Sequence, residues 1–217
     1  MLQDLQKTIK DYIQLEGIGL HNGVKVNLCL KPAEANSGIV FKRTDVDSSK
    51  NIIEANYKNV SSSVLCTKIK NSHGVSVSTI EHLMAALYIE GIDNVLVEID
   101  ASEVPIMDGS SFDFVEGIRS FGTQEQKEPK KFIKVLKKVE VKDGKKSISI
   151  EPLANDLIID FEIVYKNPLI RTRRKEFKLS NGDLSSIYNS KTFCLYEDID
   201  KIKSQGLAKG GSLENAI

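Results

Sequence analysis

The sequence has little cysteine and no excess of charge of either sign. Its 217 residues hold three cysteines, and Cys29, Cys66 and Cys194 form no C-x-x-C pair. This pattern fits reduced thiols in a cytosolic protein better than a disulfide framework. Lys plus Arg and Asp plus Glu number 30 each, so the formal net charge is zero. A balanced charge argues against a protein dedicated to nucleic-acid binding.

Long apolar runs are also missing. No stretch approaches the length that spans a membrane, and residues 1–10 lack the apolar core of a secretory signal. We therefore expect a cytoplasmic protein without a transmembrane segment. The glycine-rich stretch 206–213 lacks the G-K-[ST] ending of a Walker A loop, and the H-E-x-x-H motif is absent.

Residues 78–91 predict a short helix with both ends marked. Ser78 can cap its start, Glu81 follows at the capping-box spacing, and Gly91 can end it in a left-handed turn. His82 points nearly opposite the apolar stripe, and residues 85–86 on its side of the helix are small alanines. We therefore expect another segment to pack closely there. The apolar stripe at helical spacing consists of Ile80, Leu83, Met84, Leu87 and Tyr88.

Glu81 and His82 each allow a structural and a chemical interpretation. Glu81 occupies the position of a capping-box glutamate, and a single helical histidine is more often a surface or hydrogen-bonded residue than a ligand. The chemical interpretation is a zinc ligand beside a general base. Zinc hydrolases need three protein ligands, an open position for water and a carboxylate that takes the proton of that water.

The rest of the chain alternates short strands with a few helices, which predicts an α+β fold. A second helix is expected to begin at Ser110 or Ser111, and a hairpin to turn at residues 142–145. Residues 122–131 are polar, charged and broken by proline, which favours a domain linker. A short strand is expected at 192–195. The buried stripe of the second helix would be Phe114, Val115, Ile118 and Phe121.

Two further residues keep open alternatives. Cys66 is either a small buried apolar residue or a cysteine facing a metal pocket. His21 lies between glycines and is either a loop histidine or a site residue.

Several stretches, in this order, resemble one family. They are E-G-I-G-L-H-N-G at 16–23, L-C-T at 65–67, T-I-E-H-L-M-A-A-L at 79–87, G-I-D-N at 91–94, E-V-P-I-M-D-G-S at 103–110, K-T-F-C at 191–194 and K-G-G-S-L at 209–213. Together they resemble UDP-3-O-acyl-N-acetylglucosamine deacetylase, the LpxC family of zinc enzymes that carries out the committed step of lipid A synthesis. The resemblance extends from about residue 8 to the last residue.

The resemblance implies two α+β domains, each a sheet covered by helices, packed face to face with the site between them. Residues 1–124 would form the first domain, which carries Glu81 and His82. Residues 125–217 would form the second, incomplete domain, which carries Thr192 and the insert that makes the passage for the acyl chain. The resemblance also implies an acylated UDP-N-acetylglucosamine substrate, and we expect a monomer.

The resemblance assigns roles to individual residues. Glu81 would be the general base, His82 a ligand of Zn²⁺, and the Thr192 hydroxyl would stabilise the tetrahedral oxyanion. His21 matches the family pattern without a chemical role. The residues expected to contact substrate are Leu20, Cys66, Phe193, Ile199, Leu207, Gly211 and Ser212.

The sequence also departs from its family. The other two zinc ligands of the family lie on a later His-x-x-x-Asp stretch and the acid is a later His, whereas no histidine follows His82 here. We therefore expect the two further ligands to lie beyond Ile217. Lys191 stands where the family usually has Arg.

The chain thus resembles an amino-terminal portion of the enzyme, and these 217 residues alone are expected to bind zinc weakly and to be inactive. The alternatives are a non-catalytic truncated paralogue that binds sugar nucleotide or acyl chain, and a peptide- or protein-binding module.

Overall fold

The computed structural model describes residues 4–154 and 156–216. The predicted domains also include residues 1–3, 155 and 217, which lie outside the described ranges. Ile217 is the predicted end of the second domain, and the two further zinc ligands are expected after it. The position of those ligands stays a prediction.

The chain divides into two compact units. The larger unit contains the residues up to Lys130 and those from Ser185 onward, and the smaller unit runs from Lys131 to Leu184. Every candidate site residue named above belongs to the larger unit. The division into family domains at residue 124 stays a prediction.

The larger unit is built on a five-stranded sheet in the order β2-β3-β9-β4-β5. Neighbouring strands are antiparallel except for β4 and β9, which are parallel. Alternate residues of β3 face the core, as the period-two pattern of the sequence predicts. The strands are β2 Ile13–Ile18, β3 Lys25–Pro32, β4 Ile39–Arg43, β5 Ile52–Glu54 and β9 Val95–Ile99.

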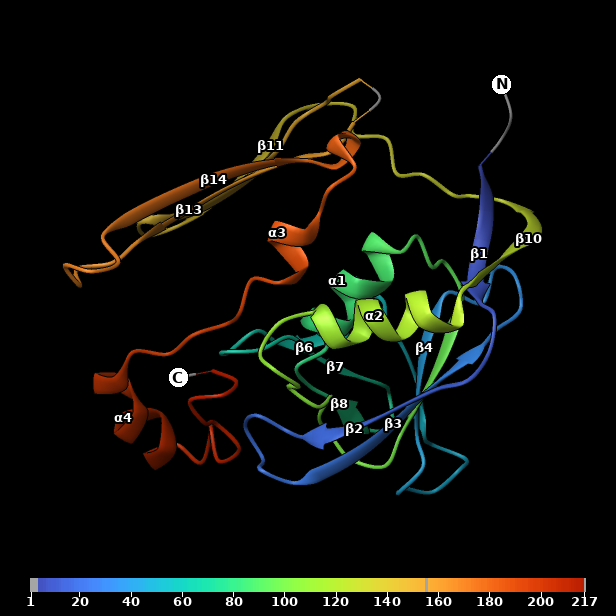
Figure 1. Ribbon diagram of the computed structural model, residues 1–217, viewed down its shortest axis with the longest axis horizontal. Helices are drawn as coiled ribbons and strands as arrows, with labels where there is room; N and C mark the ends of the chain where they lie inside the picture. Colours follow the sequence, from blue (N-terminus) through green and yellow to red (C-terminus); the bar gives the residue numbers. More distant parts are fainter. Residues whose placement is uncertain (1–3, 155, 217) are drawn as a thin grey trace. The chain divides into compact units, whose positions relative to one another are not determined.

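Two helices, α1 Glu81–Ile89 and α2 Phe112–Phe121, lie on the buried face of this sheet (Figure 1). Their apolar side chains share one core with the inward residues of the strands. Phe121 departs from the predicted stripe because it occupies the last helical position, where 47% of it is exposed. The fully buried helical residues in this core are Leu83, Ala86 and Leu87 of α1, and Phe114, Val115 and Ile118 of α2.

Helix α1 begins later than the sequence predicts. Its N-cap position falls on Ile80, which makes no side-chain capping bond, and Ser78 instead pairs through its backbone with the 102–104 segment. The predicted capping box is therefore wrong. The predicted stop is confirmed, because Gly91 has a φ of +69° and its N–H bonds to Tyr88 O. Tyr88 itself is 57% exposed, so the buried stripe is shifted toward the alanine side of the helix.

Two small sheets complete the first 130 residues. Strand β1 Leu5–Ile9 pairs antiparallel with β10 Thr123–Pro129, so most of the predicted linker is an exposed edge strand whose polar composition reflects solvent contact. The other sheet joins β6 Val60–Ser62, β7 Lys68–Lys70 and β8 Ser76–Val77, and a 3₁₀ turn, η1, spans Tyr57–Asn59.

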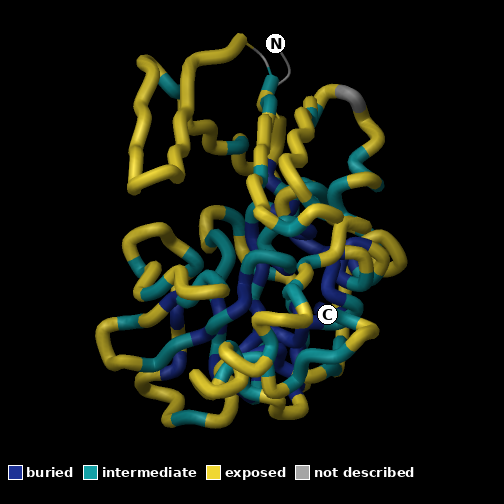
Figure 2. Tube along the Cα trace, turned by 90° about the vertical axis from the view of Figure 1, so that its left-hand side faces the viewer, coloured by how far each residue is buried: buried dark blue, intermediate teal, exposed yellow. Residues whose placement is uncertain are grey.

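The smaller unit consists of two antiparallel hairpins. One joins β11 Val139–Asp143 to β12 Lys146–Ile150 at the predicted turn, and the other joins β13 Ile158–Val164 to β14 Thr172–Lys178. The 3₁₀ turn η2 follows at Leu179–Asn181. None of the residues in these four strands is buried (Figure 2), although many of them are apolar.

The last part of the larger unit contains α3 Ser185–Tyr188, η3 Tyr196–Asp198 and α4 Ile199–Ser204. The strand expected at 192–195 is absent, because this segment extends along the 108–109 turn and Ala216 with isolated backbone bonds rather than a ladder. The mixture of sheets and short helices confirms the predicted α+β class. Within the described residues, no helix combines the length and apolar character needed to cross a membrane.

Candidate active site

The first turn of α1 carries Glu81 and His82. The Glu81 carboxylate accepts a hydrogen bond from Thr67 N–H, with Oε2 and N 3.0 Å apart. This bond ties the helix start to the 65–67 loop and holds the carboxylate next to the loop rather than over its own helix. The structure thus explains the position of Glu81 without the capping box that the sequence indicated.

His82 is half-buried on the same turn. Burial lowers the pKa of its imidazole, while the negative charges of Glu81 and Asp108 raise it by less. The ring is therefore neutral near pH 7, and the neutral imidazole is the form that binds metals or accepts a proton. The sequence pattern indicates no role for Asp108, although it belongs to the 103–110 motif. A carboxylate in an Asp-Gly turn is explained by the turn alone, so the sequence held no separate signal for it.

Thr192 reaches this region through the turn at 108–109. Its N–H donates to Gly109 O at 2.8 Å, and Lys191 Nζ lies 3.3 Å from Asp108 Oδ2. Burial of Asp108 is outweighed by hydrogen bonds from the Ser110 hydroxyl and N–H and by Lys191, which lower the pKa of its carboxyl. The Asp108–Gly109 turn therefore anchors the Lys191–Thr192 segment, and the charge of Asp108 also favours the protonated form of His82.

Cys66 lies beside the start of α1. Burial raises the pKa of its thiol, hydrogen bonds from Thr79 partly offset that rise, and the charges of Glu81 and Glu103 add to it. The thiol is therefore protonated near neutral pH, and a protonated thiol is a poor metal ligand. Cys66 is half-buried, which fits both a small buried apolar residue and a cysteine that faces a metal pocket. Its side chain lies close enough to Glu81 to be affected by that charge.

A second group of predicted residues gathers around Leu20. Gly210 N–H donates to Leu20 O at 3.0 Å, and Leu20, Ile106 and Ala216 form a small buried cluster. A Cβ on Gly210 would overlap Gly19 O, so only glycine permits this approach. A Cβ on Gly211 would touch the Leu20 side chain at 3.7 Å. The structure therefore brings Leu20 and Gly211 together.

The remaining predicted residues lie on the segment after Thr192. Phe193 is 46% exposed, whereas Ile199, Leu207 and Ser212 are half-buried. The Ser212 hydroxyl accepts a bond from Glu214 N–H, and its own N–H donates to the Asn215 side chain. The ligand contacts expected of these side chains stay predictions.

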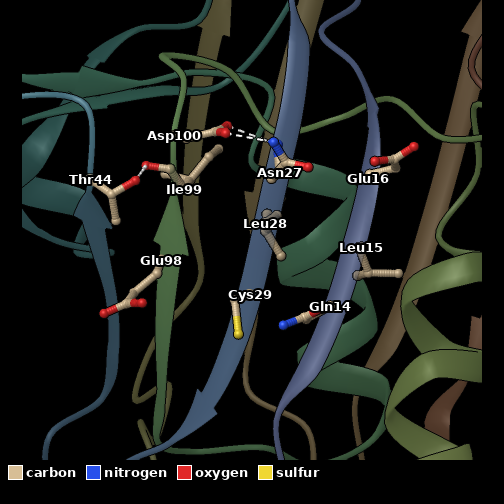
Figure 3. Close-up of a pocket in the computed structure, with 10 residues that line it drawn as sticks. All are labelled: Gln14, Leu15, Glu16, Asn27, Leu28, Cys29, Thr44, Glu98, Ile99 and Asp100. Atoms are coloured by element: carbon tan, nitrogen blue, oxygen red, sulfur yellow. Dashed lines mark hydrogen bonds between the residues drawn. The ribbon is translucent and has the colours of Figure 1, made fainter.

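A hollow of about 480 Å³ lies elsewhere, on the outer face of the five-stranded sheet (Figure 3). None of the predicted site residues lines it. Its polar groups bond to each other or to neighbours: Asn27 donates twice to Asp100, and Glu98 pairs with two lysines. We therefore place the candidate site at the start of α1 and not in this hollow.

A carboxylate and a neutral imidazole on one helical turn are features of hydrolases that activate water. Comparison with known proteins agrees with this class. The family model LpxC, UDP-3-O-acyl N-acetylglycosamine deacetylase, matches residues 6–217, and the chain belongs to this family.

Individual relatives share much of the chain. It is 45% identical over 215 residues to UDP-3-O-acyl-N-acetylglucosamine deacetylase of Actinobacillus succinogenes, and 41% identical to the proteins of that name from Haemophilus ducreyi and Shewanella violacea. Each comparison covers 98% of this chain and 70% of the relative.

Proposed function

We propose that this protein hydrolyses the N-acetyl group of UDP-3-O-(3-hydroxyacyl)-N-acetylglucosamine, the committed step of lipid A biosynthesis. One observation carries the proposal: Glu81 and His82 share the first turn of α1, where Thr67 N–H holds the Glu81 carboxylate, and the Asp108–Gly109 turn anchors the Lys191–Thr192 segment. Family membership and the names of the relatives support the same reaction and substrate class.

In the proposed reaction Glu81 is the general base. Its Oε2 is held by Thr67 N–H, and its Oε1 takes the proton from the attacking water. As the amide carbonyl becomes tetrahedral, negative charge grows on its oxygen. We assign the Thr192 hydroxyl as a hydrogen-bond donor to that oxygen, because donors aimed at a developing charge stabilise the transition state most.

Zinc is the proposed cofactor, with His82 as the ligand from this chain. The residues that the structure describes include no group of three or more His, Cys, Asp and Glu side chains placed to hold a metal ion. A catalytic zinc needs three protein ligands. The described residues therefore do not complete a zinc site by themselves. The 217-residue chain is expected to bind zinc weakly. We expect H82A to retain less zinc after dialysis than the wild type does.

The acyl chain of the substrate is proposed to follow the segment from 193 to 212. Exposed Phe193 provides apolar surface, and Gly211 lies against the side chain of Leu20, which belongs to a buried apolar cluster. Burial of a long acyl chain on such surface is favoured at about 0.8 kcal/mol per methylene. The other side chains proposed to contact substrate are Cys66, Ile199, Leu207 and Ser212.

The test is release of acetate from the acylated sugar nucleotide, measured on the protein as the cell produces it. We expect turnover to fall about 10²- to 10⁴-fold in E81Q, because the variant keeps the shape of the side chain but cannot take a proton. E116Q is the matched control, since Glu116 is an exposed glutamate on α2, and it should keep full turnover. Equal turnover in wild type and E81Q would refute the assignment.

A second candidate is a non-catalytic protein that binds sugar nucleotide or acyl chain. The observation that favours it is the incomplete set of metal ligands among the described residues. This candidate predicts that titration calorimetry detects binding of the substrate and that no acetate is released. A cytoplasmic location and a monomeric state stay predictions.

A further inference from the structure

Glu103 is a buried carboxylate that the proposed reaction does not use. Only 1% of it is exposed. Its Oε1 accepts hydrogen bonds from His21 N–H at 2.9 Å and from the Thr79 hydroxyl at 2.8 Å, and its Oε2 accepts from Asn22 N–H at 2.9 Å. Among the described residues no Lys or Arg forms an ion pair with it. Three donors from two separate segments therefore hold this charge, since a buried carboxylate without partners is strongly disfavoured.

Thr79 is the donor that connects Glu103 to the start of α1. It has a φ of +57° and is 1% exposed, two positions before Glu81. A β-branched residue in the left-handed region is strained, and such a conformation persists only where its surroundings enforce it. The bond from its hydroxyl to Glu103 enforces it here. Thr79 is also a hydrogen-bonding neighbour of the Cys66 thiol.

Backbone hydrogen bonds also hold the segment around Glu103 against the start of α1. Ser78 N–H donates to Ser102 O, and Val104 N–H donates to Ser78 O, both at 3.0 Å. The residues on either side of Glu103 therefore clamp the residue before Thr79. A small shift of the carboxylate would turn the chain at Thr79 and redirect the first turn of the helix.

The other two donors belong to the 19–23 loop. Gly19 permits the approach, because a Cβ there would lie 2.8 Å from Glu103 Oε2. The same loop supports the 208–211 segment, since Lys209 N–H and Gly210 N–H donate to His21 O and Leu20 O. One carboxylate thus fixes the helix start and the loop that underlies the proposed acyl surface.

We propose that Glu103 is a positioning residue of the deacetylase site, which sets the direction of the first turn of α1 and so the placement of Glu81 and His82. The deacetylase role of the site rests on the proposed function, whereas the effect of Glu103 on the direction of the first helical turn does not. The carboxylate acts through Thr79 and touches neither substrate nor the reacting atoms.

The variants are chosen to break individual hydrogen bonds. E103Q keeps the size of the side chain. It replaces one carboxylate oxygen, which accepts hydrogen bonds, by an NH₂ group that would face an N–H or O–H donor. T79V removes the Thr79 hydroxyl, and with it the bonds to Glu103 and to the Cys66 thiol. T79S is the matched control that keeps the hydroxyl. The first measurement is the imidazole resonances of His82 by NMR in the 217-residue chain. The second is kcat and KM for acetate release by the protein as the cell produces it.

We expect E103Q and T79V to shift the His82 resonances, and T79S to leave them in place. The double variant should shift them by less than the sum of the two single shifts, because the two changes share the Thr79–Glu103 bond. In turnover, kcat should fall about 10- to 100-fold with little change in KM, as expected for a misplaced base. A T79V chain with wild-type His82 resonances would overturn the proposal, and that variant decides the matter even where E103Q fails to fold.

The two proposals fail in different ways. If the resonances shift as expected but the wild type releases no acetate, the positioning role stands and the deacetylase assignment falls. If acetate is released and depends on Glu81, but neither variant moves the His82 signals or kcat, the positioning role falls alone.

Discussion

His82 illustrates how burial sets the chemistry of a single residue. Its pKa lies below the usual value of 6.5 because burial disfavours the charged ring more than Glu81 and Asp108 stabilise it. In the unfolded chain the ring is solvated and keeps its usual pKa. As the pH falls, the unfolded state therefore takes up the proton first, so stability is present above pH 6.5 and is lost below it.

This difference predicts a pH-dependent stability that H82Q should reduce. Between about pH 8 and about pH 5, the free energy of unfolding of the wild type should fall by more than that of H82Q, because the variant has no ring to protonate. Urea unfolding at the two pH values measures both changes. H73Q is the control, since His73 lies exposed in a loop, and it should follow the wild type. Parallel curves for wild type and H82Q would contradict the burial argument.

At the scale of elements, one glycine joins the C-terminal segment to the body of the larger unit. Gly109 has a φ of +86°, and a Cβ on it would overlap the backbone of Asn215. Its carbonyl also accepts the bond from Thr192 N–H. The contact therefore requires glycine on two grounds, the left-handed backbone and the absence of a side chain.

We predict that G109A destabilises the protein by more than G74A does. Gly74 has a φ of +84° and a Cβ added there would meet nothing within 4 Å, so its substitution costs only the backbone strain of about 1–2 kcal/mol. G109A adds a clash with backbone, which forces the 212–216 segment to move. Chemical denaturation gives the two free energies, and limited proteolysis should show faster cleavage near 212–216 in G109A alone. Equal destabilisation by the two variants would show that the 212–216 segment moves away from residue 109 without lowering the free energy of unfolding.

The elements also show how far sequence patterns reach. Strands such as β3 and the stop at Gly91 follow from local rules, period-two alternation and the freedom of glycine at positive φ. The start of α1 does not, because Ser78 bonds to Ser102, a partner far along the chain that no local pattern specifies. Glu81 and His82 are indicated by the local helix pattern and given roles by the motif resemblance. Glu103 lies in the 103–110 motif but is assigned no role there, because the burial of its carboxylate depends on donors from distant segments.

At the scale of the molecule, the two units differ in how much they bury. The larger unit has a core of fully buried residues from strands and both main helices. In the smaller unit, no residue of β11, β12, β13 or β14 is buried, and apolar side chains such as Phe161 are 62% exposed. Strands stabilised mainly by exposed backbone bonds open locally at low free energy, whereas core strands open only when most of the unit unfolds.

Hydrogen exchange followed by mass spectrometry should separate the two behaviours. We expect the amides of β13 and β14 to exchange well before those of β3 and β9. L28A, which removes a fully buried side chain of β3 and costs about 2–5 kcal/mol, should speed exchange in β3 and β9. It should leave β13 and β14 unchanged, because local opening of a hairpin does not require the core to unfold. If β13 and β14 instead exchange as slowly as β3, or accelerate with it in L28A, their protection depends on the core of the larger unit.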